Sequence, residues 1–585
     1  MILSTRAALL PLCSSLLLVL PACPDPDLEP DSPDAGNGCA SAAECAPGPC
    51  ETATCEQGSC VYRDAWDATP CTTGAASGLC FAATCRTEYR LTNGLCLIAD
   101  FADSALEQYS GPGFASEEQI RAALDDMESH WWWMSLGTHR FIWSIERIAL
   151  DQPLSATAFS DWVAYRDEVV RKAYAVIDFD HYDTDGDGLL DAMYIIASNN
   201  ELAADYLIGG MSRHLGANVF VDMQSSESVI RRAYGNFNHE VGHCLGLPDM
   251  YGPYGTIGYL SLMHDSWPVP ANGFSVYDRQ QLGWFTPTPT ARSTTGIELL
   301  RADRNFSAIR IDTPHPAEYF LVEYRKRPES GYGSRAPVHD GLAIYHALAA
   351  STQQMDPPLL KLMAADGDIR PDTFPQVSDL WSPENASGPF VAQSYLGGDD
   401  LFRIENIERT DSGLRFDVVM LAGSIAPGPD LLANGSFESG TGAAPDGWAT
   451  SSRQHLDESF GWDSSQAHDG SKSVRISMTR PNDAAWLQQV DGLTAGTGYL
   501  LCGWVRGDNV AGDANASVGA SLCQAGTWNH SAGAFGTFDW RHECVSFSPD
   551  AASAVVGCRL GYDYSPASGT SWCDGLSLVA LESAF

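Results

Sequence analysis

The twelve-residue stretch 238–249 (NHEVGHCLGLPD) constrains the fold more tightly than any other part of the chain. His239 and His243 are four residues apart, so on a helix they share one face and can reach one metal ion. Gly246 permits that helix to end in a left-handed turn, and Pro248 prevents the helix from resuming. The chain is therefore predicted to form a helix, end it and reverse direction within this stretch.

This reversal can bring Asp249 to the same ion as a third ligand and leave the fourth position open for water. Glu240 follows a ligand histidine and can touch that water without binding the metal. Zinc lowers the pKa of a bound water to ~7, so Glu240 can take its proton as the water attacks a carbonyl. The alternative is an amphipathic helix whose two surface histidines bind no metal.

Further segments resemble one family. They are 97–103 (LIADFAD), 183–191 (DTDGDGLLD), 261–263 (SLM), 281–284 (QLGW), 318–325 (EYFLVEYR) and 341–346 (GLAIYH). With the extended motif HExxHxxGxxD, they make residues 95–421 resemble the secreted bacterial metallopeptidases of the immune-inhibitor-A type.

The resemblance implies a metzincin-like α/β fold, protein or peptide substrates and a catalytic Zn²⁺ held by His239, His243 and Asp249. It also implies that Glu240 is the general base and that Met263 lies in a methionine turn beneath the site. The side chain that stabilises the oxyanion stays open, and the candidates are Tyr251, Tyr254, Tyr259 and His264.

The chain departs from the family pattern at two places. A cysteine-rich stretch occupies the position where the family usually carries an inhibitory propeptide, which leaves the control of activity open. Cys244 directly follows a ligand histidine, and it is either a buried free thiol or the disulfide partner of Cys96.

Residues 1–23 are typical of an export signal, because a thin positive region precedes an apolar stretch. The signal ends in LPAC, which resembles a bacterial lipoprotein box and predicts lipidation of Cys23; the alternative is ordinary cleavage near Ala22. Residues 24–38 are rich in Pro and Asp and predict an extended tether. No transmembrane helix is expected, so membrane contact would come only through a lipid anchor. The protein is therefore expected to be either a lipoprotein on the outer surface or a secreted extracellular protein.

Residues 39–94 form a cysteine-rich module. Its eight cysteines are Cys39, Cys45, Cys50, Cys55, Cys60, Cys71, Cys80 and Cys85. Few large apolar residues accompany them, so an exported chain is expected to staple this module with four disulfides, which allow 105 connectivities. Zinc binding is the alternative, but the gaps are mostly longer than in zinc knuckles and no histidine lies among them.

An acidic turn lies in the middle of the peptidase-like region. Asp183, Asp185, Asp187 and Asp191 occupy positions 1, 3, 5 and 9 of a calcium-loop pattern, although position 12 is Tyr194 rather than glutamate. A structural Ca²⁺ would neutralise the crowded carboxylates; the alternative is a solvated acidic turn.

The consecutive tryptophans 131–133 cannot all face one way on a helix, so at least one is expected to be partly exposed.

The sequence pattern changes at the linker 423–430. Residues 431–585 carry short strand-like runs separated by turns, which predicts an all-β sandwich. This part resembles carbohydrate-binding jelly rolls, in which Glu438 and Asp574 would share a Ca²⁺. A glycan or cell-surface ligand is one reading of its tryptophans; a tryptophan-rich core is the other. Its five cysteines allow at most two disulfides.

The chain is therefore predicted to be multidomain. The order is the signal 1–23, the tether 24–38, the disulfide-rich module 39–94, the α/β metzincin-like catalytic domain 95–300, its β-rich extension 301–422, the linker 423–430 and the jelly roll 431–585. The net charge of −40 excludes a basic nucleic-acid footprint. The expected function is a zinc endopeptidase. The alternatives are an inactive adhesion protein on a protease scaffold and a zinc amidase acting on cell-wall amides.

Overall fold

The computed structural model describes most of the chain beyond the N-terminal segment. The described residues are 39–57, 59–64, 68–102, 117–151, 162–186, 190–197, 207–212, 219–222, 224–225, 235–253, 257–264, 273–329, 332, 340–367, 377–512, 518–563 and 565–583. The predicted signal and tether, with Cys23, and the candidate calcium ligand Asp187 lie outside these residues. The chain divides into two compact units, Met1–Ala65 and Trp66–Phe585.

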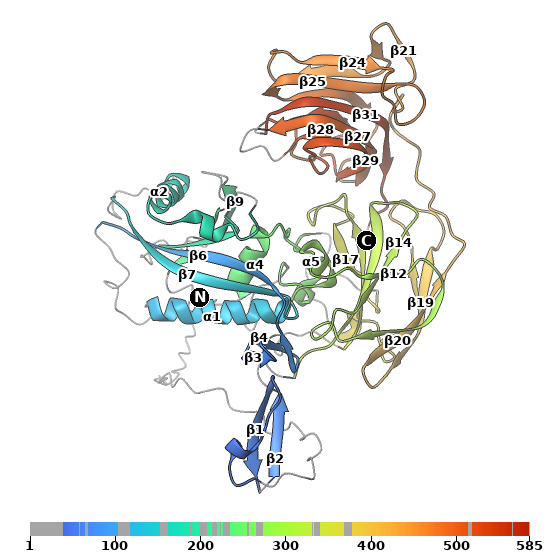
Figure 1. The fold of residues 1–585 in the computed structure, drawn as a ribbon. Coiled ribbons are helices and arrows are strands. Elements are labelled where there is room, and N and C mark those ends of the chain that lie inside the picture. Colours follow the sequence, from blue (N-terminus) through green and yellow to red (C-terminus); the bar gives the residue numbers. More distant parts are fainter. Residues whose placement is uncertain are drawn as a thin grey trace, which may run out of the picture. The chain divides into compact units, whose positions relative to one another are not determined.

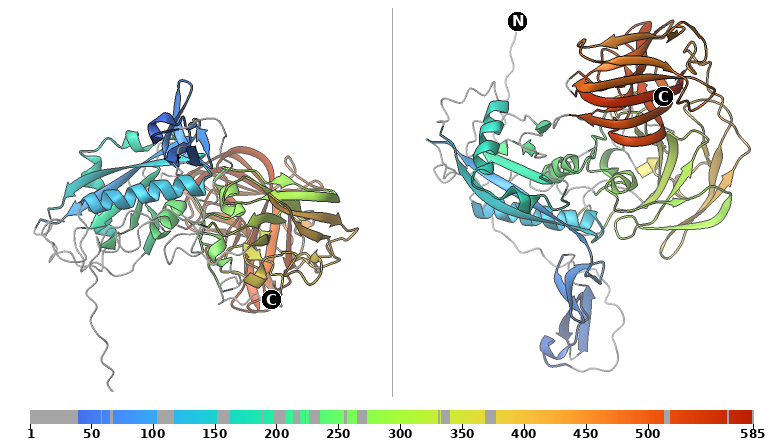
Figure 2. Two further views of the ribbon diagram at one scale, coloured as in Figure 1. Left: turned by 90° about the horizontal axis from the view of Figure 1, so that it is seen from below. Right: turned by 45° about the horizontal axis from the view of Figure 1, so that its top comes forward.

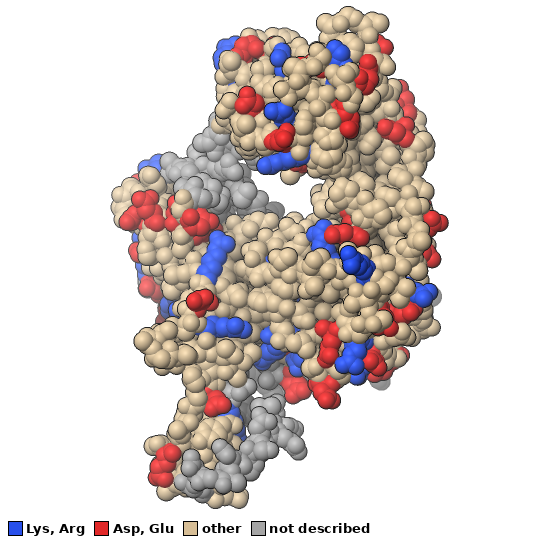
Figure 3. All heavy atoms as spheres, turned by 45° about the vertical axis from the view of Figure 1, so that its right-hand side comes forward, with Lys and Arg blue, Asp and Glu red and all other residues tan. Residues whose placement is uncertain are grey.

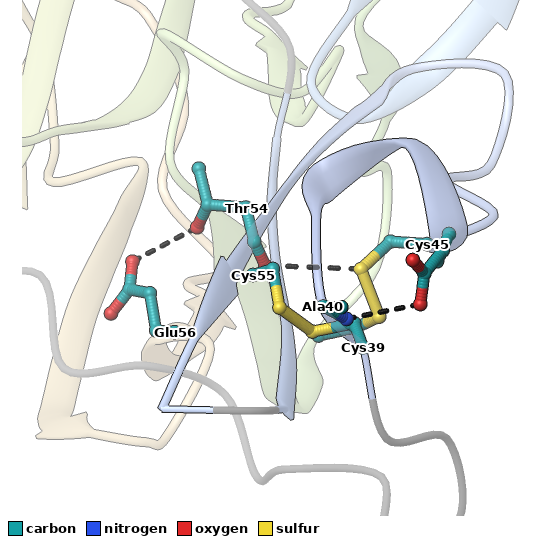
Figure 4. The surroundings of a disulfide bond; sticks show 8 residues. Cys39, Ala40, Cys45, Thr54, Cys55 and Glu56 are labelled. Carbon is teal, nitrogen blue, oxygen red and sulfur yellow. Dashed lines mark hydrogen bonds between the residues drawn. A yellow bond between two sulfur atoms is a disulfide. The ribbon is translucent and has the colours of Figure 1, made fainter.

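In the first unit, disulfides take the place of an apolar core. A 3-10 turn (η1, Ala42–Glu44) precedes an antiparallel hairpin of β1 (Glu51–Glu56) and β2 (Ser59–Asp64). The bonds Cys39–Cys55 and Cys45–Cys60 join the segment before the hairpin to its strands. Figure 4 shows the first of these bonds beside the Cys45 sulfur, which also contacts the carbonyl oxygen of Thr54.

The second unit opens with a small antiparallel sheet. Its strands are β3 (Pro70–Thr73), β4 (Ala76–Phe81) and β5 (Thr84–Arg86). Cys71 and Cys85 form a disulfide here, and Cys50 and Cys80 are disulfide-bonded as well. All eight cysteines of the predicted module are thus oxidised, which confirms the disulfide prediction over zinc binding.

A parallel sheet follows, with β6 (Arg90–Asp100) at its centre. Its order is β11 (Gln224–Ser225), β8 (Ala192–Ala197), β6 and β7 (His139–Ala149), and all pairings are parallel. A short antiparallel hairpin pairs β9 (Leu207–Ser212) with β10 (Val219–Asp222). The βαβ connections place helices on both faces of the sheet.

Successive residues of β6 face opposite sides of the sheet. Cys96 and Ile98 join the core with α1 (Glu117–Met134) and α4 (Gly235–Cys244). Leu95 and Leu97 join the other core with α2 (Trp162–Tyr174) and the 3-10 turn η4 (Phe179–Tyr182). Figure 1 shows α1 along one face of β6 and β7 and α2 on the other face, and Figure 2 shows the same layers.

The tryptophans at the end of α1 correct one expectation. Trp131, Trp132 and Trp133 are all buried, with exposed fractions of 0%, 1% and 6%. The parallel sheet covers one side of α1, and the small sheet and the β-rich region cover its other sides near the end. No side of the last turn of α1 therefore faces solvent.

The β-rich region begins with a short helix, α5 (Val276–Gln281), and builds two sheets. One has the order β12 (Thr288–Pro289), β14 (Ala308–Asp312), β15 (Glu318–Arg325), β16 (Gly341–Leu348) and β17 (Leu360–Leu362). The other has the order β13 (Thr294–Leu300), β20 (Gly413–Met420), β19 (Phe402–Arg409) and β18 (Phe390–Ala392), with the 3-10 turn η8 (Val377–Asp379) before it. Strands β15 and β16 are buried along their whole length, because one face joins the core of α1 and α4 and the other packs on the second sheet.

The C-terminal part is an antiparallel β-sandwich, as predicted. One sheet has the order β23 (Ala449–Ser452), β26 (Ala484–Asp491), β30 (Ser553–Leu560) and β28 (Ala520–Gln524). The other has the order β24 (Ser459–Asp463), β25 (Ser473–Asn482), β31 (Ala567–Ala580), β27 (Tyr499–Gly512) and β29 (Gly536–Phe547). A small ribbon pairs β21 (Gly440–Thr441) with β22 (Ala444–Pro445).

Two disulfides close the sandwich, Cys502–Cys544 and Cys558–Cys573, and Cys523 remains a free thiol. The sandwich thus reaches the limit of two bonds that its five cysteines allow. Cys96 and Cys244 are free, so the disulfide considered between them is absent from the described residues. Within the same residues, no helix is long and apolar enough to cross a membrane.

Candidate metal centre

Helix α4 carries three of the four motif residues and ends where the sequence predicts. Gly246 has a φ of +90° and its N–H donates to the carbonyl of His243 at 2.9 Å. The N–H of Leu247 donates to the carbonyl of Gly242 at 3.0 Å. These two bonds close the helix in a left-handed turn, after which the chain reverses and carries Asp249 back toward the histidines.

The two imidazoles and the carboxylate meet at one point. Nε2 of His239 and Nε2 of His243 each lie 3.2 Å from Oδ1 of Asp249. The structure therefore brings the three predicted ligands together.

The other nitrogen of each ring is held by a backbone carbonyl. Nδ1 of His239 lies 2.9 Å from the oxygen of Leu262, and Nδ1 of His243 lies 2.7 Å from the oxygen of Leu247. Because a carbonyl oxygen only accepts hydrogen bonds, each Nδ1 carries the proton. In the neutral ring, each Nε2 then presents a lone pair to the carboxylate oxygen, and such a group of acceptors calls for a cation between them.

The donor set fits zinc. Two imidazole nitrogens and one carboxylate oxygen are ligands that zinc takes in catalytic sites, with bonds of roughly 2.0–2.1 Å. A tetrahedral ion with such bonds separates its ligand atoms by ~3.3 Å, close to the observed 3.2 Å. Backbone carbonyls that orient ligand histidines are the usual support of such sites.

Glu240 is buried beside this group. Its side chain is 2% exposed, and its Oε1 has no hydrogen-bond partner among the described residues. Burial raises the pKa of this carboxyl, against the lowering effect of His239 and His243. A carboxylate with a raised pKa is a stronger base than an exposed glutamate, which suits proton abstraction.

The ligand residues shift each other's ionisation. Burial opposes ionisation of Asp249, but its contacts with His239 and His243 outweigh burial and lower the pKa of its carboxyl. Burial likewise lowers the pKa of His243, but Asp249 and the Leu247 carbonyl outweigh it and raise the pKa overall. The carboxylate is thus ionised, as a metal ligand must be.

Met263 lies directly against helix α4. A Cβ added at Gly242, between the two histidines in sequence, would come within 2.6 Å of the Met263 sulfur. The carbonyl of Met263 also accepts the N–H of Met250 at 2.8 Å. The turn at 261–263 therefore supports both the helix and the segment that carries Asp249.

Of the candidates for oxyanion stabilisation, Tyr251 contacts one of the ligand residues. Its ring stacks on His239 with 6.4 Å between ring centroids, and the side chain is 45% exposed. Burial, with the neighbouring Asp249 carboxylate, raises the pKa of the Tyr251 hydroxyl to about 12, so it stays protonated and can donate. Burial lowers the pKa of His264 to about 4. Tyr254 lies outside the described residues.

The predicted calcium turn shows a different use of its carboxylates. Asp183 accepts the N–H of Gly186 at 2.9 Å, Asp191 accepts the N–H of Thr184 at 3.0 Å, and Asp185 pairs with Arg90 at 3.5 Å. Across the described residues, these three do not form a group with oxygens mutually within 4.8 Å. Since Asp187 falls outside those residues, the calcium site stays a prediction.

In the sandwich, Glu438 and Asp574 both bind the loop 468–472. Glu438 accepts the N–H groups of Ser471 and Lys472, each at 2.8 Å. Asp574 accepts those of His468 and Asp469, at 2.7 and 3.0 Å. The carboxylates thus serve as anions for backbone amides, and a Ca²⁺ shared between them stays a prediction.

A groove of about 480 Å³ lies on the four-stranded sheet of the sandwich. Its lining is Ser451, Ser452, Arg453, Asp483, Ala485, Leu487, Ala525, Gly526, Thr527, Trp528, Arg559, Tyr562 and Asp563. Trp528 is 53% exposed, and its ring meets Tyr562 edge-on at 4.6 Å between centroids. Arg559 pairs with Asp483 and lies 3.6 Å above the Tyr562 ring. The sequence left a ligand for this domain open as one of two interpretations. It did not predict this groove, because the groove joins residues from distant strands.

Charge in this protein is dispersed on the surface that can be seen. Figure 3 shows acidic and basic side chains intermingled on the face in view. Within the groove, Arg453 also pairs with Asp563, at 3.5 Å, so each of the two arginines of the lining faces a carboxylate. The groove is therefore close to neutral and polar, with one exposed aromatic ring.

No protein-family model matches the chain, and no curated protein matches it. Solved structures are similar to it over about a quarter of its length, in the C-terminal sandwich. TmCBM61, solved with β-1,4-galactotriose, has 17% identity and a TM-score of 0.19 over 26% of this chain and 98% of its own. The CBM22-1 xylan-binding domain of Paenibacillus barcinonensis Xyn10C has 16% identity and a TM-score of 0.19 over 27% and 97%. A family 16 carbohydrate-binding module has 22% identity and a TM-score of 0.18 over 26% and 99%.

These identities and TM-scores are too low for any ligand to be carried over to this chain. The sandwich itself rests on its own strand pairing. The protein is thus multidomain and β-rich, with a disulfide-rich N-terminal region and a C-terminal antiparallel β-sandwich. Such disulfides are typical of proteins outside the cytoplasm.

Proposed function

We propose that this chain is an exported zinc-dependent endopeptidase with a metzincin-like catalytic domain. The observation that carries the proposal is the meeting of His239, His243 and Asp249 at 3.2 Å, with both histidines turned by backbone carbonyls so that Nε2 faces the carboxylate. A surface helix with two unrelated histidines has no reason to adopt this arrangement.

A bound Zn²⁺ would supply an activated water and polarise the scissile carbonyl. The chain's own residues do the rest. Glu240, buried beside the three residues, would accept the proton of the attacking water and return it to the nitrogen of the leaving amine. Tyr251, protonated and beside His239, can donate a hydrogen bond to the oxygen that becomes negative.

The proposal is tested by casein hydrolysis with the purified chain, zinc supplied, beside Glu240→Gln. Because Glu240 is not a ligand, the variant should bind zinc as the wild type does and lose at least about 10²–10⁴-fold in rate, the usual contribution of a general base. Glu118→Gln is the matched control, since Glu118 is an exposed helical glutamate of α1.

The results separate the proposal from its alternatives. A folded, zinc-loaded wild type that hydrolyses neither casein nor gelatin contradicts the endopeptidase. Activity on peptidoglycan amides instead would establish the amidase, and zinc binding without any hydrolysis would favour an inactive adhesion protein. Retained Glu240 speaks against the last, because a decayed site has no use for a buried carboxylate.

A second function is favoured for the sandwich, namely docking on a neutral glycan in the groove of Trp528. An exposed indole can stack on a sugar ring, and the paired Arg559 and Asp483 offer a donor and an acceptor for hydroxyl groups. Trp528→Ala should abolish retention on polysaccharide gels, whereas Phe535→Ala, which removes an exposed aromatic ring (39%) outside the groove lining, should not. Equal retention of both variants would contradict the assignment.

The N-terminal segment would determine where the protein is localised. An export signal with lipidated Cys23 would hold the enzyme on the outer surface, and cleavage without lipidation would release it. Mass analysis of the mature N-terminus distinguishes the two.

A further inference from the structure

The turn at 261–263 contacts both helix α4 and the segment that follows it. The Leu262 carbonyl receives Nδ1 of His239 at 2.9 Å, and the Met263 carbonyl receives the N–H of Met250 at 2.8 Å. Any shift of this turn therefore moves the acceptor that sets both the tautomer and the direction of the His239 ring.

A buried carboxylate holds this turn. The Ser261 hydroxyl donates to Oδ2 of Asp278 at 2.6 Å and accepts the N–H of Met263 at 3.0 Å. Ser261 and Asp278 are fully buried, at 0% exposure. Because both side chains are buried, bulk solvent does not compete for the hydrogen bond between them.

The same carboxylate oxygen also builds the start of α5. It accepts the N–H of Ser275 at 2.7 Å and the Ser275 hydroxyl at 2.8 Å. The first of these bonds, together with the Asp278 N–H donated to the Ser275 hydroxyl oxygen at 3.3 Å, forms the capping box of that helix. Asp278 thus has two tasks, one local to α5 and one directed at the turn through Ser261. Since α5 packs on β15, the turn is tied to the β-rich region as well.

We propose that Asp278 is a positioning residue of the metal centre, which acts through Ser261 and the Leu262 carbonyl on His239. The inference rests on the proposed zinc site. It explains why a capping residue that would ordinarily be exposed is buried here, and why its carboxylate takes three donors on one oxygen.

The two tasks can be separated by substitution. Ser261→Ala removes the link to the turn and leaves the capping box intact. Ser275→Ala removes the cap hydroxyl and leaves the link intact, so it is the matched control. Asp278→Asn keeps the size of the side chain and weakens both the link to the turn and the capping box. It replaces Ser261→Ala in the test if near-ultraviolet circular dichroism shows that Ser261→Ala does not fold.

The measurement is zinc affinity of the purified full chain by competition with a chromophoric chelator, together with the visible spectrum of the Co²⁺-loaded protein. Loss of a group that orients a ligand typically weakens metal binding ~10–100-fold. Ser261→Ala and Asp278→Asn should therefore bind zinc at least about tenfold more weakly and change the Co²⁺ spectrum. Ser275→Ala should lower the unfolding midpoint but keep the affinity and spectrum of the wild type.

Wild-type zinc affinity and spectrum in Ser261→Ala and Asp278→Asn would overturn the inference. Equal loss in Ser261→Ala and Ser275→Ala would overturn it too, because the effect would then come from the stability of α5. A wild type that binds no zinc removes the proposed metal centre itself, and the inference with it.

Discussion

The close contact between Gly242 and Met263 makes a quantitative prediction for Gly242→Ala. The new Cβ would lie 2.6 Å from the Met263 sulfur, 3.3 Å from its terminal methyl and 3.4 Å from Cδ1 of Leu247. Carbon atoms in contact are most stable at roughly 3.5–4.0 Å, so the methyl group overlaps the sulfur strongly and touches two further atoms closely.

Two opposing terms set the size of the effect. Alanine in a helix interior is favoured over glycine by about 1 kcal/mol, whereas an extra methyl in a packed core costs about 1–3 kcal/mol. The sum is a destabilisation of about 0–2 kcal/mol. Met263 can yield only partly, because its carbonyl is bonded to the N–H of Met250, so the strain also reaches the turn that orients His239.

Tryptophan fluorescence in a denaturant series provides the assay, since Trp131 and Trp132 share the core of Met263. Gly242→Ala should lower stability, and the same change made in a Met263→Ala background should raise it by about 1 kcal/mol, the bare helix preference. The difference between the two backgrounds measures the collision. If Gly242→Ala raises stability equally in both and zinc affinity is unchanged, then Met263 does not support the helix.

Three further predictions concern pH, catalysis and metal. Burial, with the Arg90 charge, lowers the pKa of His139 to about 3, so the unfolded chain takes up a proton near pH 6.5 that the folded chain refuses. The stability is complete above pH ~6.5 and falls by about 1.4 kcal/mol per pH unit between there and pH ~3; His139→Gln should flatten this slope in denaturation at several pH values. Tyr251→Phe should lower kcat by ~10²-fold with little change in zinc affinity, and a change confined to KM would exclude oxyanion stabilisation. Added zinc should raise the melting temperature of the wild type but not of His243→Ala, as scanning calorimetry can check.

The geometry of the candidate metal centre was predictable in part because its three candidate ligands lie within one short stretch. The spacing of His239 and His243 on a helix, and the turn at Gly246, are local properties that residue types encode. The partners that orient the rings were not predictable. Leu262 and Leu247 contribute backbone carbonyls, which any residue possesses, so no side-chain signal marks them.

Ser261 and Asp278 illustrate a second limit. Serine and aspartate at these positions read as ordinary turn and cap residues, and α5 does carry the capping box. Their common role depends on a bond between residues 17 positions apart, in a place that becomes buried only when the β-rich region packs on α5. An aspartate at a helix cap is usually exposed, so a buried one would suggest a further role. Whether Asp278 is buried, however, is itself decided by tertiary packing.

The tryptophans of α1 show the same limit for burial. Three consecutive large rings cannot share one face of a helix, so the helix alone predicts exposure of at least one. They are buried because different elements cover different sides: Trp132 donates to the Cys80 carbonyl of the small sheet, whereas Trp131 meets Trp284 beyond α5.

The sequence by itself determined the structural features that depend on residues close together along the chain. It determined helix α4 and its end, the oxidised state of the cysteine module, the sandwich and the upper limit on the number of its disulfides. Tertiary structure alone decided which cysteines pair, which carbonyls orient the histidines, how the groove of Trp528 is assembled and which buried carboxylate holds the turn beside helix α4. The physical reason is that helices and turns follow from local backbone energetics, whereas a pairing or a buried hydrogen bond depends on where distant segments exclude water together.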